Sequence, residues 1–266
     1  MSINLTASDR SVLYAIISGE HAVSAIESDK KKSWWKKLAL SQYYYFDTES
    51  HIICNNLAPL DLLKIKHQRI QKTIEMSPLK VKALKTKLEQ LNIGPFIIFH
   101  PSAQYKYKVY PKKLRDELLT YLSGLGVDIL ITGGQSKIDD EIKRTLPLLS
   151  NSYDFIGETS LEDYFYLSYL SLGYIGMDTL NMHIAASQDK RIFSIFGPTN
   201  LKMWSPWSNQ LQRAATIDKP LQTYGNVTLF QANMPCVACG MAGCDNNNSV
   251  SECLNNIAPS VIFSEI

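Results

Sequence analysis

The residues best suited to chemistry lie in the second half of the 266-residue chain, where an apolar run ends in Gly176. Asp178, Thr179 and Leu180 follow at the expected mouth of a helix. The first N–H groups of a helix have no partner within it, so this turn can bind a diphosphate. His183, about one turn further on, is a candidate for the same crevice, although a lone histidine on a helix is more often packed or solvated.

A second candidate loop runs from His100 to Pro111 and carries Ser102 and Lys108. A hydroxyl, backbone N–H groups and a lysine at a helix start make an anion site of the kind that phosphate needs. A solvated loop is the alternative, and this segment alone favours it. Two more turns follow apolar runs, namely Thr132-Gly133-Gly134-Gln135 and Gly197-Pro198-Thr199. Paired glycines permit a close approach to a ligand, although a plain strand-to-helix turn explains the first of them equally well.

These loops need elements to position them, and from Pro95 onward short apolar runs alternate with helical patterns. The runs predict strands at 96–99, 127–131, 153–156, 172–175 and 192–196. Helices are expected at 111–123 and 138–149, after the capping residue Ser160, and from Asp178. This alternation predicts a parallel sheet covered on both faces. In such sheets ligands bind beyond the carboxyl ends of the strands, where the candidate loops lie.

The first 94 residues give a weaker pattern and predict a separate, incomplete domain. Strands are expected at 2–5 and 22–26, and helices at 9–18, capped by Ser8, and at 80–91. Domains most often have about 100–150 residues, so we expect part of this one to be missing. The boundary also divides the charge, because 14 basic and 9 acidic residues precede Gly94 whereas 13 basic and 16 acidic residues follow it. We therefore expect domains at 1–94 and 95–266.

The overall composition excludes several classes of protein. With 45% hydrophobic and 20% charged residues, the chain is not disordered, collagen-like or a small disulfide scaffold. No stretch reaches the roughly 18 uninterrupted apolar residues that cross a bilayer. The opening residues lack a basic leader, so we expect no signal peptide.

The basic part of the chain contains a cluster of lysine and tryptophan at 30–37, with the sequence KKKSWWKK. Indoles at the interface and lysines on lipid phosphates suit an anionic membrane surface, each lysine contributing up to about 1 kcal/mol. A solvated charged loop is the alternative. We expect no nucleic-acid binding, because no recognition fold accompanies the patch and the rest of the chain is acidic.

The tail contains Cys236, Cys239, Cys244 and Cys253 in a glycine- and asparagine-rich context. Thiols this close can bind zinc or an iron–sulfur cluster, but the last spacing matches none of the common patterns. The same four cysteines can instead remain reduced thiols or form a local disulfide. Cys54 is distant in the sequence and is expected to serve packing.

Two blocks in the second half resemble the signature of glycosyltransferase family 9, the ADP-heptose:lipopolysaccharide heptosyltransferases. They are Asp178-Thr179-x-x-Met182-His183-Ile184-Ala185-Ala186 and Phe196-Gly197-Pro198-Thr199. Neighbouring motifs follow in the family's order: His100-Pro101-Ser102, Lys108 three residues before Pro111, Thr132-Gly133-Gly134, and the stretch 157–161. Segments 4–11 and 51–63 also look like the middle of the family's N-terminal domain, so the resemblance covers essentially the whole chain.

The resemblance implies a GT-B-like α/β architecture of two Rossmann-like domains, the N-terminal one incomplete and the C-terminal one binding the nucleotide sugar. It implies inverting transfer of heptose from ADP-heptose to the lipopolysaccharide inner core, with no metal or other cofactor. It further implies a cytoplasmic enzyme that is peripheral at the inner face of the inner membrane.

The resemblance also assigns roles to residues of the donor site. The residues at donor-binding positions are Ser102, Lys108, Asp178, Thr179, Leu180 and His183. Without a metal, the protein itself must stabilise the negative charge that grows on the leaving ADP. Lys108, Ser102 and the helix N–H groups would do so, while Asp178 and His183 would place the sugar-diphosphate.

Two departures from the family pattern bear on activity. The family has glycine where this chain has Leu180, and a leucine narrows the approach of backbone to phosphate. Family members begin with a strand and a Gly-Asp loop that supplies the general base, and this chain starts downstream of it. No motif supports Asp9 in that role, so the catalytic residue is unassigned. The alternatives to an active enzyme are a truncated, impaired nucleotide-sugar-binding relative and a scaffold built on a cysteine-bound metal.

Overall fold

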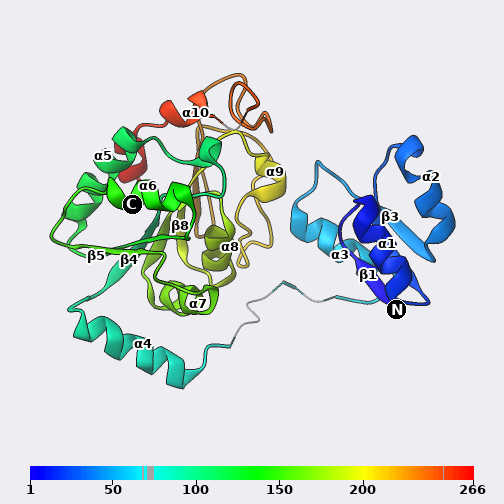
Figure 1. The fold of residues 1–266 in the computed structure, drawn as a ribbon, viewed down its shortest axis with the longest axis horizontal. Helices are drawn as coiled ribbons and strands as arrows, with labels where there is room; N and C mark the ends of the chain where they lie inside the picture. The colour runs from blue at the N-terminus through cyan, green and yellow to red at the C-terminus, as the bar shows by residue number, and fades with distance from the viewer. Residues whose placement is uncertain (68, 71–74, 248) are drawn as a thin grey trace. The chain divides into compact units, whose positions relative to one another are not determined.

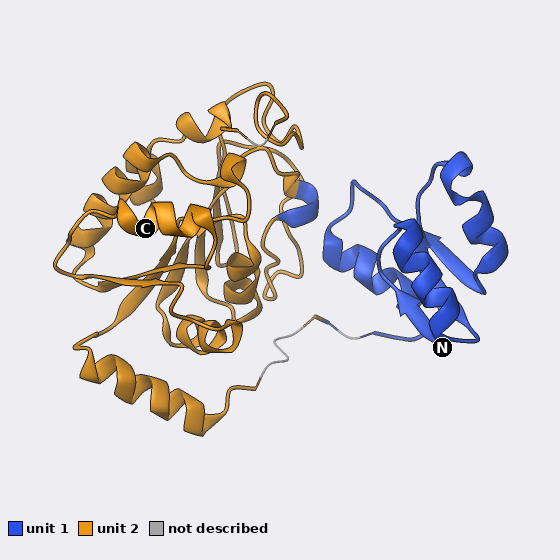
Figure 2. Cartoon of the chain, in the orientation of Figure 1, with its two compact units in different colours: residues 1–69, 202–204 blue, residues 70–201, 205–266 orange. Residues whose placement is uncertain are grey.

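A computed structural model describes residues 1–67, 69–70, 75–247 and 249–266. The chain forms two compact units, which we describe separately (Figure 2). Unit 1 comprises residues 1–69 and 202–204, and unit 2 comprises residues 70–201 and 205–266. Helix α4 (Pro78–Gln90) belongs to unit 2, where it packs against α7 (Leu161–Leu170). The two units therefore divide before this helix, whereas the expected boundary followed Gly94. No helix in the described ranges is long and apolar enough to span a membrane.

Unit 2 is built on a sheet with the strand order β6-β5-β4-β7-β8-β10-β9 (Figure 1). Its strands are β4 (Phe96–His100), β5 (Asp128–Gly133), β6 (Ser152–Ile156), β7 (Gly173–Met177), β8 (Arg191–Ile195), β9 (Leu221–Tyr224) and β10 (Val227–Phe230). The connecting elements are the turns η1 (Lys106–Lys108) and η2 (Ser123–Leu125) and the helices α5 (Lys112–Leu122), α6 (Lys137–Arg144), α8 (Leu180–Ser187), α10 (Glu252–Asn255) and α11 (Pro259–Phe263). The short helix α9 (Leu201–Trp204) has its first residue in unit 2 and the other three in unit 1. Neighbouring strands are parallel except β9 and β10, which confirms the predicted α/β class.

The strand order creates a switch point between β4 and β7. From β4 the chain proceeds outward through β5 and β6, and it then returns to β7 on the other side of β4 and proceeds to β8. His100 at the end of β4 is paired in register with Gly176 near the end of β7. In open α/β sheets, ligands bind in the crevice beyond the carboxyl ends of the strands at such a point.

Side chains alternate along the strands, so the sheet buries two separate cores. Phe96 and Ile98 face the core that includes residues of α4, α7 and α8. Ile97 and Phe99 face the core that includes residues of α5, α6 and α11. Fully burying one such side chain stabilises the fold by roughly 1.5–3 kcal/mol. Burial on both faces explains why the strands appear in the sequence as continuous apolar runs.

One predicted helix is shorter than expected. The sequence predicts a helix at 138–149, but α6 ends at Arg144, with Thr145 as its C-cap. Pro147 lies two residues further on, and a proline disfavours helical backbone at the residue before it. The last five residues of the expected helix, 145–149, therefore lie outside it.

Unit 1 contains a parallel sheet with the order β1-β2-β3. Its elements are β1 (Ser2–Asn4), α1 (Asp9–Ser18), β2 (Ala22–Ile26), α2 (Lys30–Ala39), β3 (Gln42–Tyr45) and α3 (Ile52–Leu62). Ser8 caps α1 as predicted, because its hydroxyl accepts the N–H of Ser11. The lysine and tryptophan cluster forms helix α2, which Asp29 caps by accepting the N–H of Lys31. The cluster is therefore a helix and not a loop, although the lysines at 30–32 are exposed to solvent.

Lys36 is withdrawn from the cluster into the interior of unit 1. Its side chain is fully buried, and its ammonium lies 2.6 Å from a Glu27 carboxylate oxygen and 2.7 Å from an Asp9 carboxylate oxygen. It also donates a hydrogen bond of 2.6 Å to the carbonyl of Ala7. Burial alone would lower the pKa of Lys36, but its hydrogen bonds to the two carboxylates outweigh burial and raise it. Lys36 therefore ties the segments after β1 and β2 together.

We predict that Lys36→Ala destabilises unit 1 by about 2 kcal/mol, because it leaves two carboxylates and a carbonyl without their shared donor. The cost falls below the roughly 3–5 kcal/mol of a broken, fully buried pair, since the Asp9 and Glu27 side chains are 68% and 33% exposed. Urea unfolding followed by tryptophan fluorescence measures it. The matched control is Lys32→Ala, at an exposed position of the same helix, which should change stability by less than about 0.5 kcal/mol. Equal effects of the two substitutions would contradict this role for Lys36.

Candidate functional site

The switch point of unit 2 holds an ion pair between Lys108 and Asp178. Lys108 ends the turn η1, and Asp178 directly follows β7. The Lys108 ammonium lies 2.8 Å from an Asp178 carboxylate oxygen, and the side chains are 24% and 8% exposed. The structure thus brings together two predicted site residues that lie 70 positions apart. A cation that is partly open to solvent beside the ends of β4 and β7 can bind an anion.

The first turn of α8 lies next to this pair. Thr179 is the N-cap residue of α8, but its side chain makes no capping hydrogen bond. Its hydroxyl instead lies 3.4 Å from the hydroxyl of Tyr174. The Thr179 carbonyl accepts the N–H of Met182, but no cap side chain accepts the N–H groups of Leu180 and Asn181, which leaves these two for a ligand. Leu180, the first residue of α8, is 60% exposed at this mouth.

His183 belongs to the same electrostatic group as Lys108 and Asp178. Burial lowers the pKa of its imidazole, the Asp178 carboxylate raises it, and the Lys108 ammonium lowers it. The net effect is a lowered pKa, so the ring is neutral at pH 7. Of the predicted donor-binding residues, five therefore share one place: Lys108, Asp178, Thr179, Leu180 and His183.

Ser102 is oriented differently, because its hydroxyl donates a hydrogen bond of 2.5 Å to Asp139. The same Asp139 carboxylate accepts the N–H groups of Gly134 and Ser136, at 2.8 and 2.9 Å. Ser102 and Asp139 are 3% and 4% exposed. These hydrogen bonds keep the pKa of Asp139 low in spite of burial, which acts in the opposite direction. Ser102 thus links the loop after β4 to the turn after β5.

Sequence reasoning missed Asp139, although a signal was present. Ser136 and Asp139 form a capping box at the start of α6, a pattern that is readable as Ser-x-x-Asp. What the pattern does not reveal is the additional bond from Ser102, which is distant in the chain.

His100 is a second residue whose role was missed. Its Nδ1 atom lies 2.9 Å from the Thr132 hydroxyl and 3.0 Å from the amide nitrogen of Asn181 in α8. Burial lowers the pKa of His100 to about 4, so the ring is neutral and one of its nitrogens can accept a hydrogen bond. The ring therefore ties the ends of β4 and β5 to the first turn of α8. Its place in the His-Pro-Ser motif was the available signal.

The Gly197-Pro198-Thr199 turn follows β8 at the same edge of the sheet. The Thr199 hydroxyl oxygen is buried and has no hydrogen-bond partner among the described residues. A Cβ on Gly197 would lie 3.2 Å from the side chain of Leu254, so glycine permits close packing here. The orphaned hydroxyl is a group that a ligand or a water molecule can satisfy.

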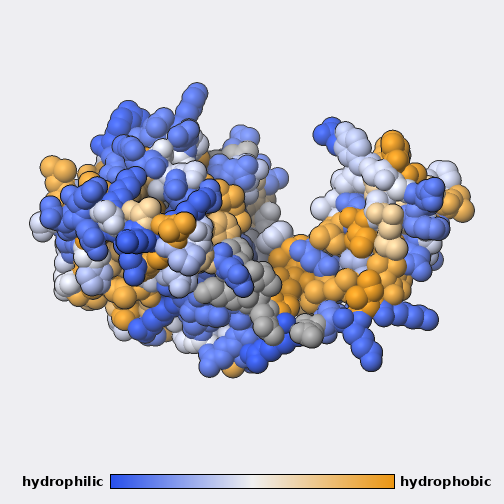
Figure 3. Space-filling model, turned by 90° about the horizontal axis from the view of Figure 1, so that it is seen from below, coloured by the Kyte–Doolittle hydropathy of each residue, from blue (hydrophilic) through white to orange (hydrophobic). Residues whose placement is uncertain are grey.

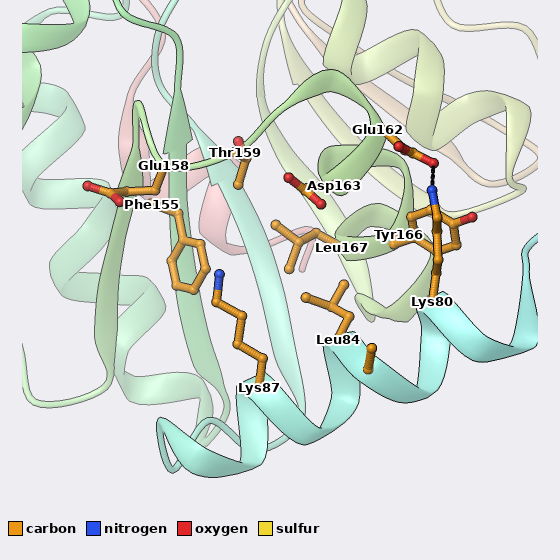
Figure 4. A pocket seen from close by; sticks show the side chains of 11 residues that line it. Lys80, Leu84, Lys87, Phe155, Glu158, Thr159, Glu162, Asp163, Tyr166 and Leu167 are labelled. Atoms are coloured by element: carbon orange, nitrogen blue, oxygen red, sulfur yellow. Dashed lines mark hydrogen bonds and ion pairs between the residues drawn. The ribbon is translucent and has the colours of Figure 1, made fainter.

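A pocket of about 310 Å³ lies two strands away, where β6 ends and α7 begins (Figure 4). Phe155, Leu84 and Leu167 supply apolar surface, and Thr159 and Asp163 supply polar groups. Its outer part is bridged by an ion pair between Lys80 of α4 and Glu162 of α7. Adjacent strands are about 4.8 Å apart, so the pocket lies roughly 10 Å from β4 along the edge of the sheet.

The cysteines of the tail are free thiols in this structure. The pKa of the Cys253 thiol is raised to about 11, mainly by burial and to a smaller extent by the neighbouring thiols. Within the described ranges, no group of three or more His, Cys, Asp or Glu side chains is arranged to hold a metal ion. Cys54 is exposed rather than packed, contrary to expectation. The arrangement at the switch point therefore offers a lysine and a helix N-terminus for anion binding.

Similarity to known proteins agrees with these features. A family model described as glycosyltransferase family 9 (heptosyltransferase) matches residues 27–230. Lipopolysaccharide heptosyltransferase 3 of Escherichia coli is 23% identical over 211 residues, which are 75% of this chain and 59% of that protein. The protein of the same name from strain K12 is 24% identical over 197 residues, 71% of this chain and 56% of that protein. The chain thus spans less than three-fifths of these relatives.

Solved structures of low identity share the fold. ADP-heptose lipopolysaccharide heptosyltransferase II of E. coli has a TM-score of 0.68 and 16% identity, covering 97% of this chain and 72% of that one. E. coli heptosyltransferase WaaC, solved with ADP, has a TM-score of 0.66 and 15% identity, covering 99% and 70%. These likenesses confirm the GT-B-like α/β fold. The family model matches most of the length of this chain, and the chain therefore belongs to glycosyltransferase family 9, the heptosyltransferases.

Proposed function

We propose that this protein binds ADP-heptose at the carboxyl edge of the unit 2 sheet and transfers the heptose to the lipopolysaccharide inner core. The transfer inverts the anomeric configuration and uses no metal. The observation that carries the proposal is the Lys108–Asp178 pair beside the uncapped first turn of α8. The solved structure of WaaC with ADP supports the choice of nucleotide.

The chemistry follows from the leaving group. As the bond between heptose C1 and the phosphate oxygen breaks, negative charge grows on the diphosphate of ADP. Lys108 exchanges its Asp178 partner for the phosphate, and the N–H groups around Thr179 and Leu180 bind the remaining oxygens. Asp178 and His183 then position the sugar. Ser102 acts mainly by holding its loop, since its hydroxyl is bonded to Asp139.

The nucleoside extends from this point along the edge of the sheet toward β6. The glycine turn after β5 lies on that path, and a Cβ at Gly134 would lie 3.2 Å from the Asp139 carboxylate, so glycine lets this turn pack against Asp139. The pocket between α4 and α7 offers an apolar surface from Phe155 and Leu84 with polar groups beside it, which suits a nucleobase.

The second substrate is anionic and membrane-held, and helix α2 suits such a partner. Trp34 and Leu38, one helical turn apart, are 62% and 81% exposed. Three exposed lysines precede them at 30–32. On the face of the molecule drawn in Figure 3, hydrophobic and hydrophilic residues lie side by side on unit 1. Lys36 is excluded from this surface by burial. We propose that α2 binds anionic lipid or the phosphorylated core at the cytoplasmic face of the inner membrane.

A second candidate function is nucleotide-sugar binding without efficient transfer. It is favoured by Leu180, whose exposed side chain stands where the family has a glycine. Asp9, the acidic residue nearest to the end of β1, is held by Lys36 at 2.7 Å, and no residue of the chain is assigned as general base. The two functions share the donor site and differ in turnover.

A transfer assay separates the two functions. ADP-heptose and a core-deficient lipopolysaccharide acceptor should yield heptosylated product and ADP, each measured by mass spectrometry. We expect product that increases with enzyme concentration. ADP binding without product would instead establish the nucleotide-sugar-binding function, and the absence of both would contradict the whole proposal.

We expect Lys108→Ala to weaken ADP binding by about 10- to 100-fold, because a hydrogen bond between charged groups contributes about 1.5–3 kcal/mol. Calorimetric titration with ADP measures the change. Lys106→Ala is the matched control, since Lys106 lies exposed on the same turn and should change the affinity less than twofold. An unchanged affinity in Lys108→Ala would contradict the assigned diphosphate site.

The affinity for ADP should rise as the pH falls from about 8 toward 5.5. The free His183 imidazole has a pKa below the ordinary 6.5, and a bound diphosphate raises it, so binding takes up a proton. Calorimetry across this range, in buffers of different ionisation enthalpy, gives the number of protons taken up. His183→Gln should bind ADP with a flatter pH profile, and its remaining slope reports the phosphate's own titration. Parallel profiles for the two proteins would exclude His183 from the site.

A further inference from the structure

The C-terminal strap, which we define as residues 234–247 and 249–257, contacts two of the loops at the proposed donor site. Gly240 donates its N–H to the Pro198 carbonyl at 2.7 Å. The Ser251 hydroxyl donates to the Tyr107 carbonyl at 2.8 Å. The strap also accepts a hydrogen bond of 2.5 Å from the Tyr110 hydroxyl at its Ile257 carbonyl. The bonds to Tyr107 and from Tyr110 therefore hold the chain on both sides of Lys108 in the sequence.

Lys108 needs such support because its own element is small. The turn η1 has three residues and no capping side chain. Two hydrogen bonds close it, from Lys108 N–H to the Tyr105 carbonyl and from Val109 N–H to the Lys106 carbonyl. Short 3-10 turns have poorer hydrogen-bond geometry than α-helices, so contacts from outside determine where their side chains point.

The hydroxyl of Ser251 bonds the Tyr107 carbonyl and does not cap its own helix. Ser251 is the N-cap residue of α10, a position where serine usually bonds the N–H groups of its own helix. Here it makes no capping bond and donates to Tyr107 instead. Ser251 is only 4% exposed and Tyr107 is half-buried, so the Tyr107 carbonyl would lose its partner at a partly buried place if the hydroxyl were removed.

The strap is itself well anchored where Ser251 lies. Cys253 and Leu254, at 7% and 1% exposure, are part of the core that also includes residues of α5 and α11. The Glu252 N–H donates to the sulfur of Cys244 at 3.2 Å. The Cys244 N–H in turn donates to the Val250 carbonyl. A rigid anchor can transmit its position to the long side chain of Lys108.

We propose that Ser251 is a positioning residue, which holds the turn η1 so that the Lys108 ammonium reaches the first turn of α8. The inference rests on the proposed function of Lys108 as a diphosphate ligand. It assigns the cysteine-bearing tail a role in building the donor site, with Ser251 as the residue that acts on Lys108.

The test compares ADP affinity in single and double variants by calorimetry. Ser251→Ala should weaken ADP binding about fivefold, the effect of one hydrogen bond. Ser251→Thr, which keeps the hydroxyl, should bind ADP as the wild type does. In a Lys108→Ala background, Ser251→Ala should have no further effect. An equal loss with and without Lys108 would overturn the proposal, because it would indicate general loosening of the fold.

A second readout needs no ligand. In the free protein, amide hydrogen exchange at residues 106–109 should be faster in Ser251→Ala than in the wild type. Ser264→Ala is the matched control, since it removes a comparable hydroxyl bond, to the Val261 carbonyl at 2.9 Å, elsewhere in the C-terminal region. It should leave both exchange and ADP affinity unchanged. If wild-type protein fails to bind ADP, the proposed function fails, and exchange alone then decides the role of Ser251. Unchanged exchange in Ser251→Ala would overturn that role.

Discussion

The ion pair between Lys108 and Asp178 is the interaction on which the proposed site depends. It joins the loop after β4 to the loop after β7, the two strands that flank the switch point of the sheet. With the side chains only 24% and 8% exposed, each charge needs a partner, and a bound diphosphate would supply another one for the lysine. Removing Asp178 would leave Lys108 without its partner in the free protein. In the proposed reaction, the pair thus keeps a cation ready at the place where negative charge would develop.

Buried polar contacts keep this place in shape. His100 ties the ends of β4 and β5 to α8, and Asp139 ties Ser102 to the turn before α6. Both contacts depend on protonation states that do not change near neutral pH. Burial lowers the pKa of His100, so its imidazole stays neutral, and hydrogen bonds lower the pKa of Asp139, so its carboxylate stays charged. The site is therefore preorganised over the physiological range, while His183 is the group whose charge responds to a ligand.

Much of this arrangement could be predicted from the sequence, because strand ends in a parallel sheet meet at one edge. That rule brings Lys108 near Asp178 without any knowledge of their contact. The rule does not reveal which group a hydroxyl contacts. Ser102 bonds the Asp139 carboxylate and Ser251 bonds the Tyr107 carbonyl, and such pairings depend on the path of loops through space. Burial of Lys36 was unpredictable for a similar reason. Trp35 and Lys37 beside it are only half-buried and the lysines at 30–32 are exposed, and the position of α2 relative to Asp9 and Glu27 buries Lys36 fully.

The most direct test of the account is a crystal structure of the protein with ADP. We expect the diphosphate between the Lys108 ammonium and the N–H group of Leu180, with the lysine moved from Asp178 to a phosphate oxygen and the nucleoside directed toward β6. ADP bound elsewhere, or bound while Lys108 still contacts only Asp178, would contradict the claim that this ion pair marks the donor site.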